Sequence, residues 1–146
     1  MNDQQLINAA VEFWESAYLF TGITPLHRNY LLKRGGKPCG ACAVGAAGVY
    51  VGVDTSYRHS NMAYSKRSAI AIARHLHKTL GTYGYAWWRR FVEGVECGFE
   101  SWGFAGDENT RPFRLGRIAG ERIAGLVFIK CPKEQVKEVP CLVKSN

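Results

Sequence analysis

The sequence has no long apolar segment. Its longest uncharged apolar run, Ala41–Val53, has 13 residues and is rich in glycine, whereas a helix that crosses a bilayer needs about 20 apolar residues. Residues 1–18 also lack the basic stretch followed by an apolar stretch that marks a signal peptide. We therefore expect a cytoplasmic protein without a membrane partner.

The sequence also lacks the cysteine pattern of a small domain stabilised by disulfides. It contains five cysteines, an odd number, at irregular spacings. Without a secretion signal, this pattern favours reduced thiols in a cytoplasm.

Acidic residues are scarce. The chain has 12 Asp and Glu residues against 19 Lys and Arg residues, which gives a formal net charge of +7. Such a balance favours an anionic partner. Nucleic acid and an acidic protein both meet this requirement, and composition does not choose between them.

The motifs of common catalytic sites are missing. The sequence contains no Gly-x-Ser-x-Gly, no phosphate-binding loop and no His-Glu-x-x-His. Glu93, Glu96 and Glu100 share one side of a predicted helix, but such runs are usually solvated, and nothing in the sequence indicates the pocket that acid–base chemistry needs. The sequence therefore disfavours an enzyme, and we expect no cofactor.

What the chain does contain is helical periodicity. Its 146 residues are 47% hydrophobic, which suits one globular domain. Apolar spacing and capping residues predict these helices: Asp3–Phe20, a short helix from Pro25 to Gly35-Gly36, Cys39–Val51, Lys66–Leu80, Tyr85–Trp102 and Pro112–Phe128.

These helices predict an all-α fold, a compact bundle of five to six helices in which residues 1–146 form a single helical domain. Short apolar runs leave two alternatives open, because periodicity alone does not separate a short strand from a short helix. Leu126–Ile129 and Val139–Val143 are alternatively a small β-hairpin near the C-terminus, and Val49–Val53 is alternatively a strand.

One predicted helix has a side with almost no side chains. This glycine stripe consists of Ala41, Gly45, Gly48 and Gly52, which lie within about 60° of one another on a helix. Glycine in a helix costs about 1 kcal/mol relative to alanine, so the stripe indicates very close approach by another element. The notch at Gly94 and Gly98 is the partner that we expect.

Cys39-Gly40-Ala41-Cys42 is the segment most typical of an enzyme. In these four residues it resembles the Cys-Gly-x-Cys of thioredoxin-like proteins, which implies redox or metal chemistry. That fold places an apolar strand before the motif, whereas basic residues and predicted helices surround it here. Packed thiols are the favoured interpretation. A zinc site with His75 or His77 is disfavoured because these two histidines diverge on their helix.

Basic residues gather in two groups that suit a phosphate backbone. The candidate nucleic-acid contacts are Arg28, Lys33, Arg34, Arg67, Arg74 and Lys78.

The sequence thus predicts a small, basic, non-enzymatic interaction or accessory protein that forms a homo-oligomer or binds an acidic protein. The alternative is a nucleic-acid-binding protein that uses its basic helix faces. A weaker alternative is a small-molecule binder with an aromatic pocket between helices.

Overall fold

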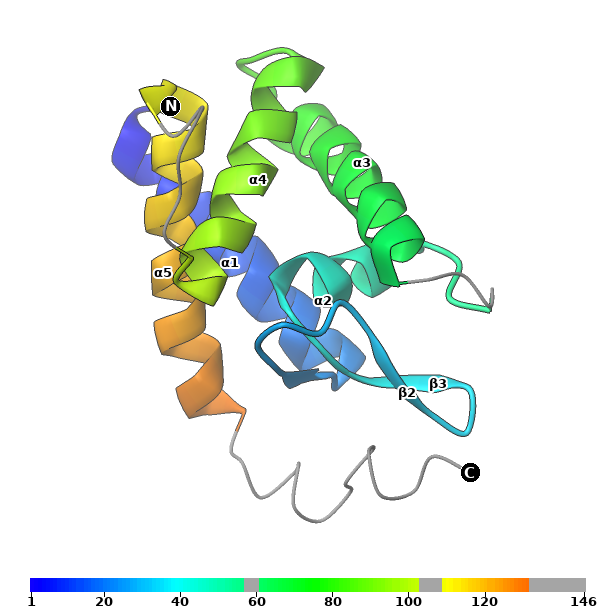
Figure 1. Ribbon diagram of the computed structural model, residues 1–146. Coiled ribbons are helices and arrows are strands. Elements are labelled where there is room, and N and C mark those ends of the chain that lie inside the picture. Colours follow the sequence, from blue (N-terminus) through cyan, green and yellow to red (C-terminus); the bar gives the residue numbers. More distant parts are fainter. Residues whose placement is uncertain (57–60, 103–108, 132–146) are drawn as a thin grey trace.

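The computed structural model describes residues 1–56, 61–102 and 109–131. Within these ranges, five helices and three short strands are formed (Figure 1). They are α1 (Asp3–Thr21), β1 (Thr24–Pro25), β2 (Leu32–Arg34), β3 (Lys37–Ala41), α2 (Ala43–Tyr50), α3 (Asn61–Leu80), α4 (Tyr85–Glu100) and α5 (Arg111–Lys130). The fold is helix-dominated, as predicted, with a small sheet that was not.

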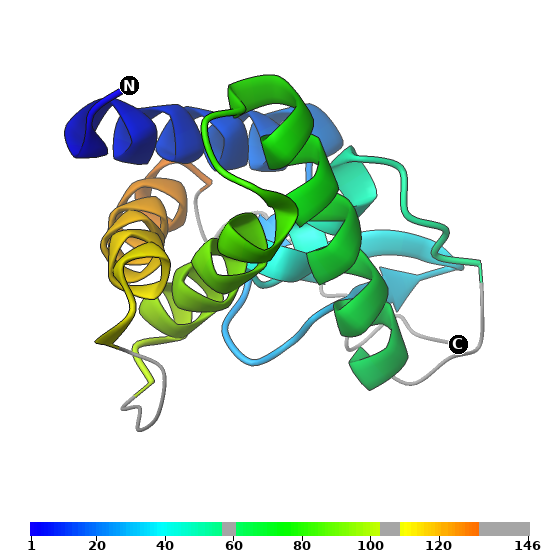
Figure 2. The ribbon, with the colours of Figure 1, turned by 90° about the horizontal axis from the view of Figure 1, so that it is seen from above.

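The core is built from one side of α1, α3 and α5 and from two segments in which every residue is buried, Ala43–Gly48 of α2 and Gly94–Glu100 of α4. Figure 2 shows α1 lying across one side of the molecule, in contact with α2 and α5. Its buried side includes Trp14 and Tyr18, which belong to the same hydrophobic cluster as Trp88 and Phe91 of α4. Asn2 begins α1 with a capping box, and Gly22 ends it in a left-handed conformation. None of the helices in the described ranges is both long enough and apolar enough to cross a membrane.

The helices α4 and α5 are in direct backbone contact. A Cβ atom on Gly94 or Gly98 would lie 2.2 Å from a carbonyl oxygen of α5, and a Cβ on Gly116 or Gly120 would lie 2.1 Å from one of α4. Gly94 meets Phe113 and Gly98 meets Arg117, so the contacts advance together along both helices. The two helices therefore run parallel, side by side in Figure 1, with two Gly-x-x-x-Gly pairs as their interface.

The glycine stripe has other partners than the expected one. Its first residue belongs to β3, and Gly52 follows α2 with a φ of +93°. A Cβ on Gly45 would lie 1.5 Å from the carbonyl oxygen of Tyr30, and one on Gly48 would lie 2.2 Å from the Ser68 hydroxyl of α3. Close approach occurs at both glycines, but the predicted contact with Gly94 and Gly98 is wrong.

The predicted helix from Pro25 is also wrong, because this segment joins a three-stranded sheet of order β1-β3-β2. β1 pairs parallel with β3, and β2 pairs antiparallel with β3, with Arg34 opposite Lys37. Gly35 and Gly36 form the two-residue turn between them, with φ values of +57° and +79°. Two positive φ angles are what a type I′ hairpin turn requires, so these glycines end a strand rather than a helix.

The first half of the alternative C-terminal hairpin is helical instead of a strand. α5 continues to Lys130, so Leu126–Ile129 are helical, and Val139–Val143 lies outside the described residues. Val49 and Tyr50 likewise end α2 instead of beginning a strand. In both places the short run lies within or beside a longer helical pattern of apolar residues. That longer pattern decides the structure, although the run itself is rich in β-branched residues.

Candidate functional site

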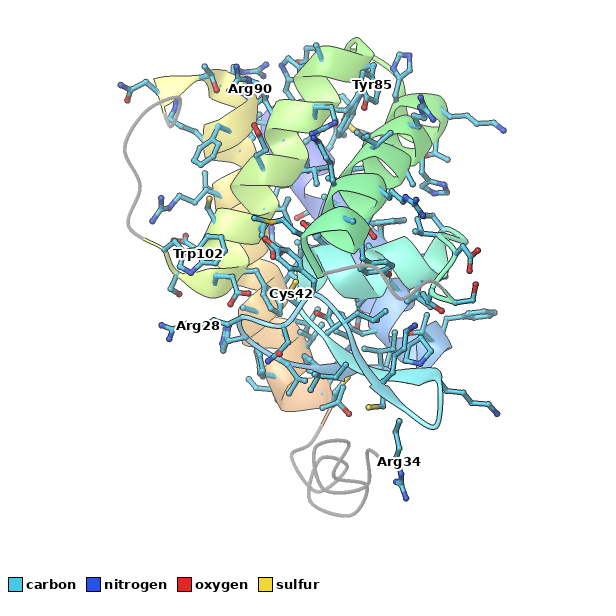
Figure 3. The ribbon with its side chains drawn as sticks, turned by 45° about the vertical axis from the view of Figure 1, so that its right-hand side comes forward. Arg28, Arg34, Cys42, Tyr85, Arg90 and Trp102 are labelled. Carbon is cyan, nitrogen blue, oxygen red and sulfur yellow. The ribbon has the colours of Figure 1, made fainter. Side chains whose placement is uncertain are left out.

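The junction between β3 and α2 is anchored by three aromatic side chains from other elements. Trp14 donates its indole hydrogen to the carbonyl of Ala43 at 2.9 Å, and Tyr18 donates its hydroxyl hydrogen to the carbonyl of Ala41 at 3.0 Å. From α3, Tyr64 donates to the carbonyl of Gly45 at 2.8 Å. These bonds place Cys42 at the N-cap of α2, in the centre of the molecule (Figure 3).

Glu96 of α4 reaches this junction from the opposite side. Its Oε1 accepts from the main-chain N–H of Val44 at 3.3 Å, and its Oε2 accepts from the thiol of Cys42 at 3.0 Å. The first turn of a helix leaves N–H groups without partners. Cys42, the N-cap residue of α2, makes no side-chain cap hydrogen bond. Glu96 therefore caps α2 from another helix.

Glu100 lies one turn further along α4 and holds a second loop. Its Oε2 accepts from the main-chain N–H of Arg28 at 2.7 Å, and its Oε1 lies 3.0 Å from Nδ1 of His27. The Glu100 side chain is 1% exposed, whereas His27 is 48% exposed. His27 thus covers a carboxylate that is otherwise enclosed by protein.

Cys42, Glu96 and Glu100 together form the carboxylate–thiol cluster. One ligand atom from each lies within 4.8 Å of the other two, and all three residues are buried. Burial, together with the neighbouring Glu100, raises the pKa of Glu96 to about 7, although the hydrogen bonds from Cys42 and Val44 act in the opposite direction. Burial and the adjacent Glu96 also raise the pKa of the Cys42 thiol well above its ordinary value.

A pocket of about 470 Å³ adjoins the cluster. Its lining includes Glu96 and Val44, and most of its other residues come from α3 and α4. The lining is mostly apolar and includes Tyr30, Met62, Ala69, Val92, Trp102 and Phe113. This volume falls within the roughly 300–1,000 Å³ typical of small-molecule sites.

Arg89 is a polar lining residue with an unused hydrogen-bond donor. Its Nε is buried and has no hydrogen-bond partner among the described residues. Its Nη1 donates to the hydroxyl of Tyr85 at 3.3 Å. A buried donor without an acceptor costs about 1–3 kcal/mol, so a ligand that brings an acceptor to Arg89 would recover this energy.

The predicted cysteine pair is divided by the fold. Cys39 lies in β3 and is disulfide-bonded, whereas Cys42 is a free buried thiol. The expectation of reduced thiols therefore fails at Cys39. A redox dithiol needs a thiolate whose pKa is lowered, and the Cys42 thiol is shifted in the opposite direction.

The two histidines that were weighed as zinc ligands with these cysteines have other surroundings. The ring of His75 packs against Phe13, and Nδ1 of His77 lies 2.8 Å from the carbonyl oxygen of Tyr83. Neither belongs to the metal-competent group that contains Cys42.

The six basic candidates for nucleic-acid contact are not on one element. Arg67, Arg74 and Lys78 lie on the exposed side of α3. Arg28 lies beside the last turn of α4, and Arg34 lies near the end of the β2–β3 hairpin (Figure 3). Lys33, also on β2, donates to the carbonyl of Thr55.

Sequence reasoning missed the roles of Glu96, Glu100 and His27. Of the three glutamates expected to be solvated, Glu93 is exposed, but Glu96 and Glu100 are buried, so the expectation is wrong for both. The sequence did contain one signal for their burial, which is their position on the helix. Gly94 and Gly98 lie on one side of this segment and Phe99 on another, so little of its surface is left for water.

Comparisons with known proteins add no further constraint. No protein-family model matches the chain, and no curated protein or solved structure is significantly similar to it.

Proposed function

We propose that this protein is a non-enzymatic binding protein that takes a small amphipathic organic anion into the pocket between α3 and α4. The observation that carries the proposal is the buried Nε of Arg89, which has no acceptor and lines a mostly apolar pocket. This proposal keeps the non-enzymatic role expected from the sequence and favours its small-molecule alternative.

The apolar walls favour a ligand with a hydrophobic body. Rings from Tyr30, Trp102 and Phe113 and the aliphatic side chain of Val92 line the pocket. Pockets that combine such walls with a few polar groups orient small molecules through those groups. The hydrophobic body would supply most of the affinity, and Arg89 would set its orientation.

The charged lining residues favour an anion over a cation. Glu93 forms an ion pair with Arg90 at 3.7 Å, and Glu96 already accepts from Val44 and Cys42. Arg89 keeps an unused donor, and Lys66 lies on the opposite wall. A carboxylate matches the fork of an arginine side chain, and the net charge of +7 attracts anions to the chain as a whole.

The test compares three ligands with one hydrophobic chain and different head groups. Octanoate, octanol and octylammonium are titrated into the protein by isothermal titration calorimetry. We expect octanoate to bind at least about tenfold more tightly than either analogue, which corresponds to about 1.4 kcal/mol. Equal or tighter binding of octylammonium would refute the anion preference, and the absence of saturable binding by all three would refute the pocket.

Two arginines provide matched variants. Arg89→Met removes the buried donor, whereas Arg74→Met removes a charge from an exposed residue of α3 that does not line the pocket. We expect Arg89→Met to weaken octanoate binding about 10–100-fold and to leave octanol binding unchanged. Arg74→Met should leave both affinities within about twofold of the original.

Nucleic-acid binding is the second candidate, and the composition of α3 favours it. This 20-residue helix contains four Lys and Arg residues and no Asp or Glu. A basic helix face of this kind suits a phosphate backbone. If it serves this purpose, affinity for a short duplex falls steeply with salt and is lost in Arg67→Ala/Arg74→Ala. Affinity that is equal at low and high salt would contradict it.

Self-association and an acidic protein partner remain predictions from composition. Light scattering of the purified protein, before and after nuclease treatment, tests self-association and carried nucleic acid together. A monomeric mass in both samples would remove the homo-oligomer from consideration.

A further inference from the structure

The carboxylate–thiol cluster brings together donors that metal ions use. Cys42 offers a thiol sulfur from the N-cap of α2, and Glu96 and Glu100 offer carboxylate oxygens from successive turns of α4. The three ligand atoms lie within 4.8 Å of one another and are buried. Zn–O and Zn–S bonds of about 2.0–2.3 Å place the ligand atoms of one ion at most about 4.6 Å apart, so small shifts of these side chains bring all three within reach of one ion.

Each carboxylate is held by the backbone at one oxygen only. Glu96 uses Oε1 for the N–H of Val44, and Glu100 uses Oε2 for the N–H of Arg28. Their other oxygens face the thiol of Cys42 and the imidazole of His27. Outer hydrogen bonds of this kind orient metal ligands and fix which oxygen is presented to the ion.

The cluster has a deficit of positive charge. Among the ion pairs of the described residues, neither Glu96 nor Glu100 is paired with a lysine or arginine; only the half-exposed His27 contacts Glu100. Two adjacent buried carboxylates repel each other unless a proton or a cation lies between them. A divalent ion would supply the missing charge to both at once.

We infer that Cys42, Glu96 and Glu100 form a binding site for a divalent transition-metal ion, and that zinc fits this donor set best. Ca²⁺ and Mg²⁺ require oxygen ligands alone, which the thiol excludes. Zn²⁺ accepts cysteine, glutamate and histidine in one site, and three protein ligands leave its fourth position to water or to His27. The thiol proton of Cys42 passes to solvent when the ion binds.

Glu96 belongs both to the cluster and to the pocket lining, but this inference does not rest on the proposed organic ligand, because Arg89, which carries that proposal, is not part of the cluster. It revises the sequence-based expectation that no cofactor is bound. It also differs from the zinc site weighed on sequence grounds, because Cys42 is the only residue common to both sets.

The test uses the full chain, treated with a chelator and handled anaerobically so that Cys42 remains a thiol. Zinc binding is measured by competition with a chromophoric chelator, and Co²⁺ serves as the spectroscopic probe. We expect one ion per chain and a thiolate-to-cobalt charge-transfer band in the near ultraviolet. The absence of saturable zinc and cobalt binding up to millimolar concentrations would overturn the inference.

Matched variants separate the cluster from unspecific thiol or carboxylate binding. Cys42→Ser should abolish the charge-transfer band, and Glu96→Gln should weaken zinc binding at least about tenfold. The controls are Cys97→Ser, which removes a buried thiol of α4, and Glu93→Gln, which neutralises an exposed carboxylate of the same helix. Both variants should bind zinc and cobalt as the original protein does.

The folding of Cys42→Ser decides which measurements test the site. If Cys42→Ser does not fold, as judged by circular dichroism, the cobalt spectrum of the original protein and the zinc affinity of Glu96→Gln decide. A band that persists in a folded Cys42→Ser variant, or that disappears in Cys97→Ser, would overturn the assignment. His27→Ala should weaken zinc binding about 10–100-fold, as expected for a residue that orients or supplements the ligands.

Discussion

The two sides of α4 achieve burial by opposite means. On one side, Gly94 and Gly98 have no side chains, and the backbone of α4 touches that of α5. On the other side, Glu96 and Glu100 extend their side chains to backbone N–H groups of Val44 and Arg28. Every residue from Gly94 to Glu100 is buried as a result. The comparison shows that one helix can be enclosed by direct backbone contact on one side and by side chains that cap distant backbone N–H groups on another.

The glycine side should be the more sensitive of the two. In Gly98→Ala, the new Cβ would lie 2.2 Å from the carbonyl oxygen of Arg117, a backbone atom that cannot move without shifting α5. We expect the free energy of unfolding to fall by about 3 kcal/mol, at the upper end of overpacking effects. Denaturant unfolding measures this loss. A change below about 0.5 kcal/mol would show that the two helices separate easily.

The carboxylate side should follow with a smaller effect. Glu96→Ala leaves the N–H of Val44 without its acceptor, and we expect a loss of about 2 kcal/mol. Glu96→Gln keeps an acceptor oxygen and should lose less than about 1 kcal/mol. Glu93→Ala, on the exposed part of α4, is the control and should remain within about 0.5 kcal/mol of the original. Equal losses in Glu96→Ala and Glu93→Ala would contradict the capping role of Glu96.

The smallest effect should have the opposite sign. Gly125 lies in α5, and a Cβ built there meets no atom within 4 Å. Gly125→Ala should therefore gain helix propensity without a steric cost and stabilise the protein by about 0.5–1 kcal/mol. Thermal unfolding of Gly125→Ala beside Gly98→Ala isolates the effect of backbone contact. Destabilisation of Gly125→Ala would show that glycine is needed in α5 for a reason other than close approach.

The long helices could be predicted because their periodic patterns extend over several turns. The predicted Lys66–Leu80, Tyr85–Trp102 and Pro112–Phe128 correspond to α3, α4 and α5, although α3 begins five residues earlier. Periodicity identifies which side of such a helix is apolar, but not which other helix meets it. For this reason the need for close approach at Gly94 and Gly98 was predictable, whereas α5 as their partner was not.

The small sheet was predictable in part. Gly35-Gly36 between Lys33-Arg34 and Lys37-Pro38 has the spacing of a two-residue hairpin. Its strands are basic and only partly buried, so they lack the apolar alternation that normally identifies a strand. The glycines were therefore interpreted as a helix end.

The candidate site was the least predictable part of the molecule. His27, Cys42 and Glu96 come from a loop, a helix cap and a distant helix, and no local spacing relates them. Their proximity depends on bonds that Trp14, Tyr18 and Tyr64 make to the backbone around Cys42. A single sequence does not reveal such tertiary anchors, whereas the structure shows them directly.

The separation of contacts along the chain has a consequence for the order of folding. α4 and α5 are consecutive helices, whereas the hydrogen bonds of Glu96 and Glu100 join residues 52 to 73 positions apart. Closing a longer loop costs more chain entropy, and local contacts generally form faster. We therefore expect the α4–α5 pair to assemble before the cluster closes. Any ion or ligand that depends on the cluster would then recognise only chains that have completed folding, and would draw the population toward them by mass action.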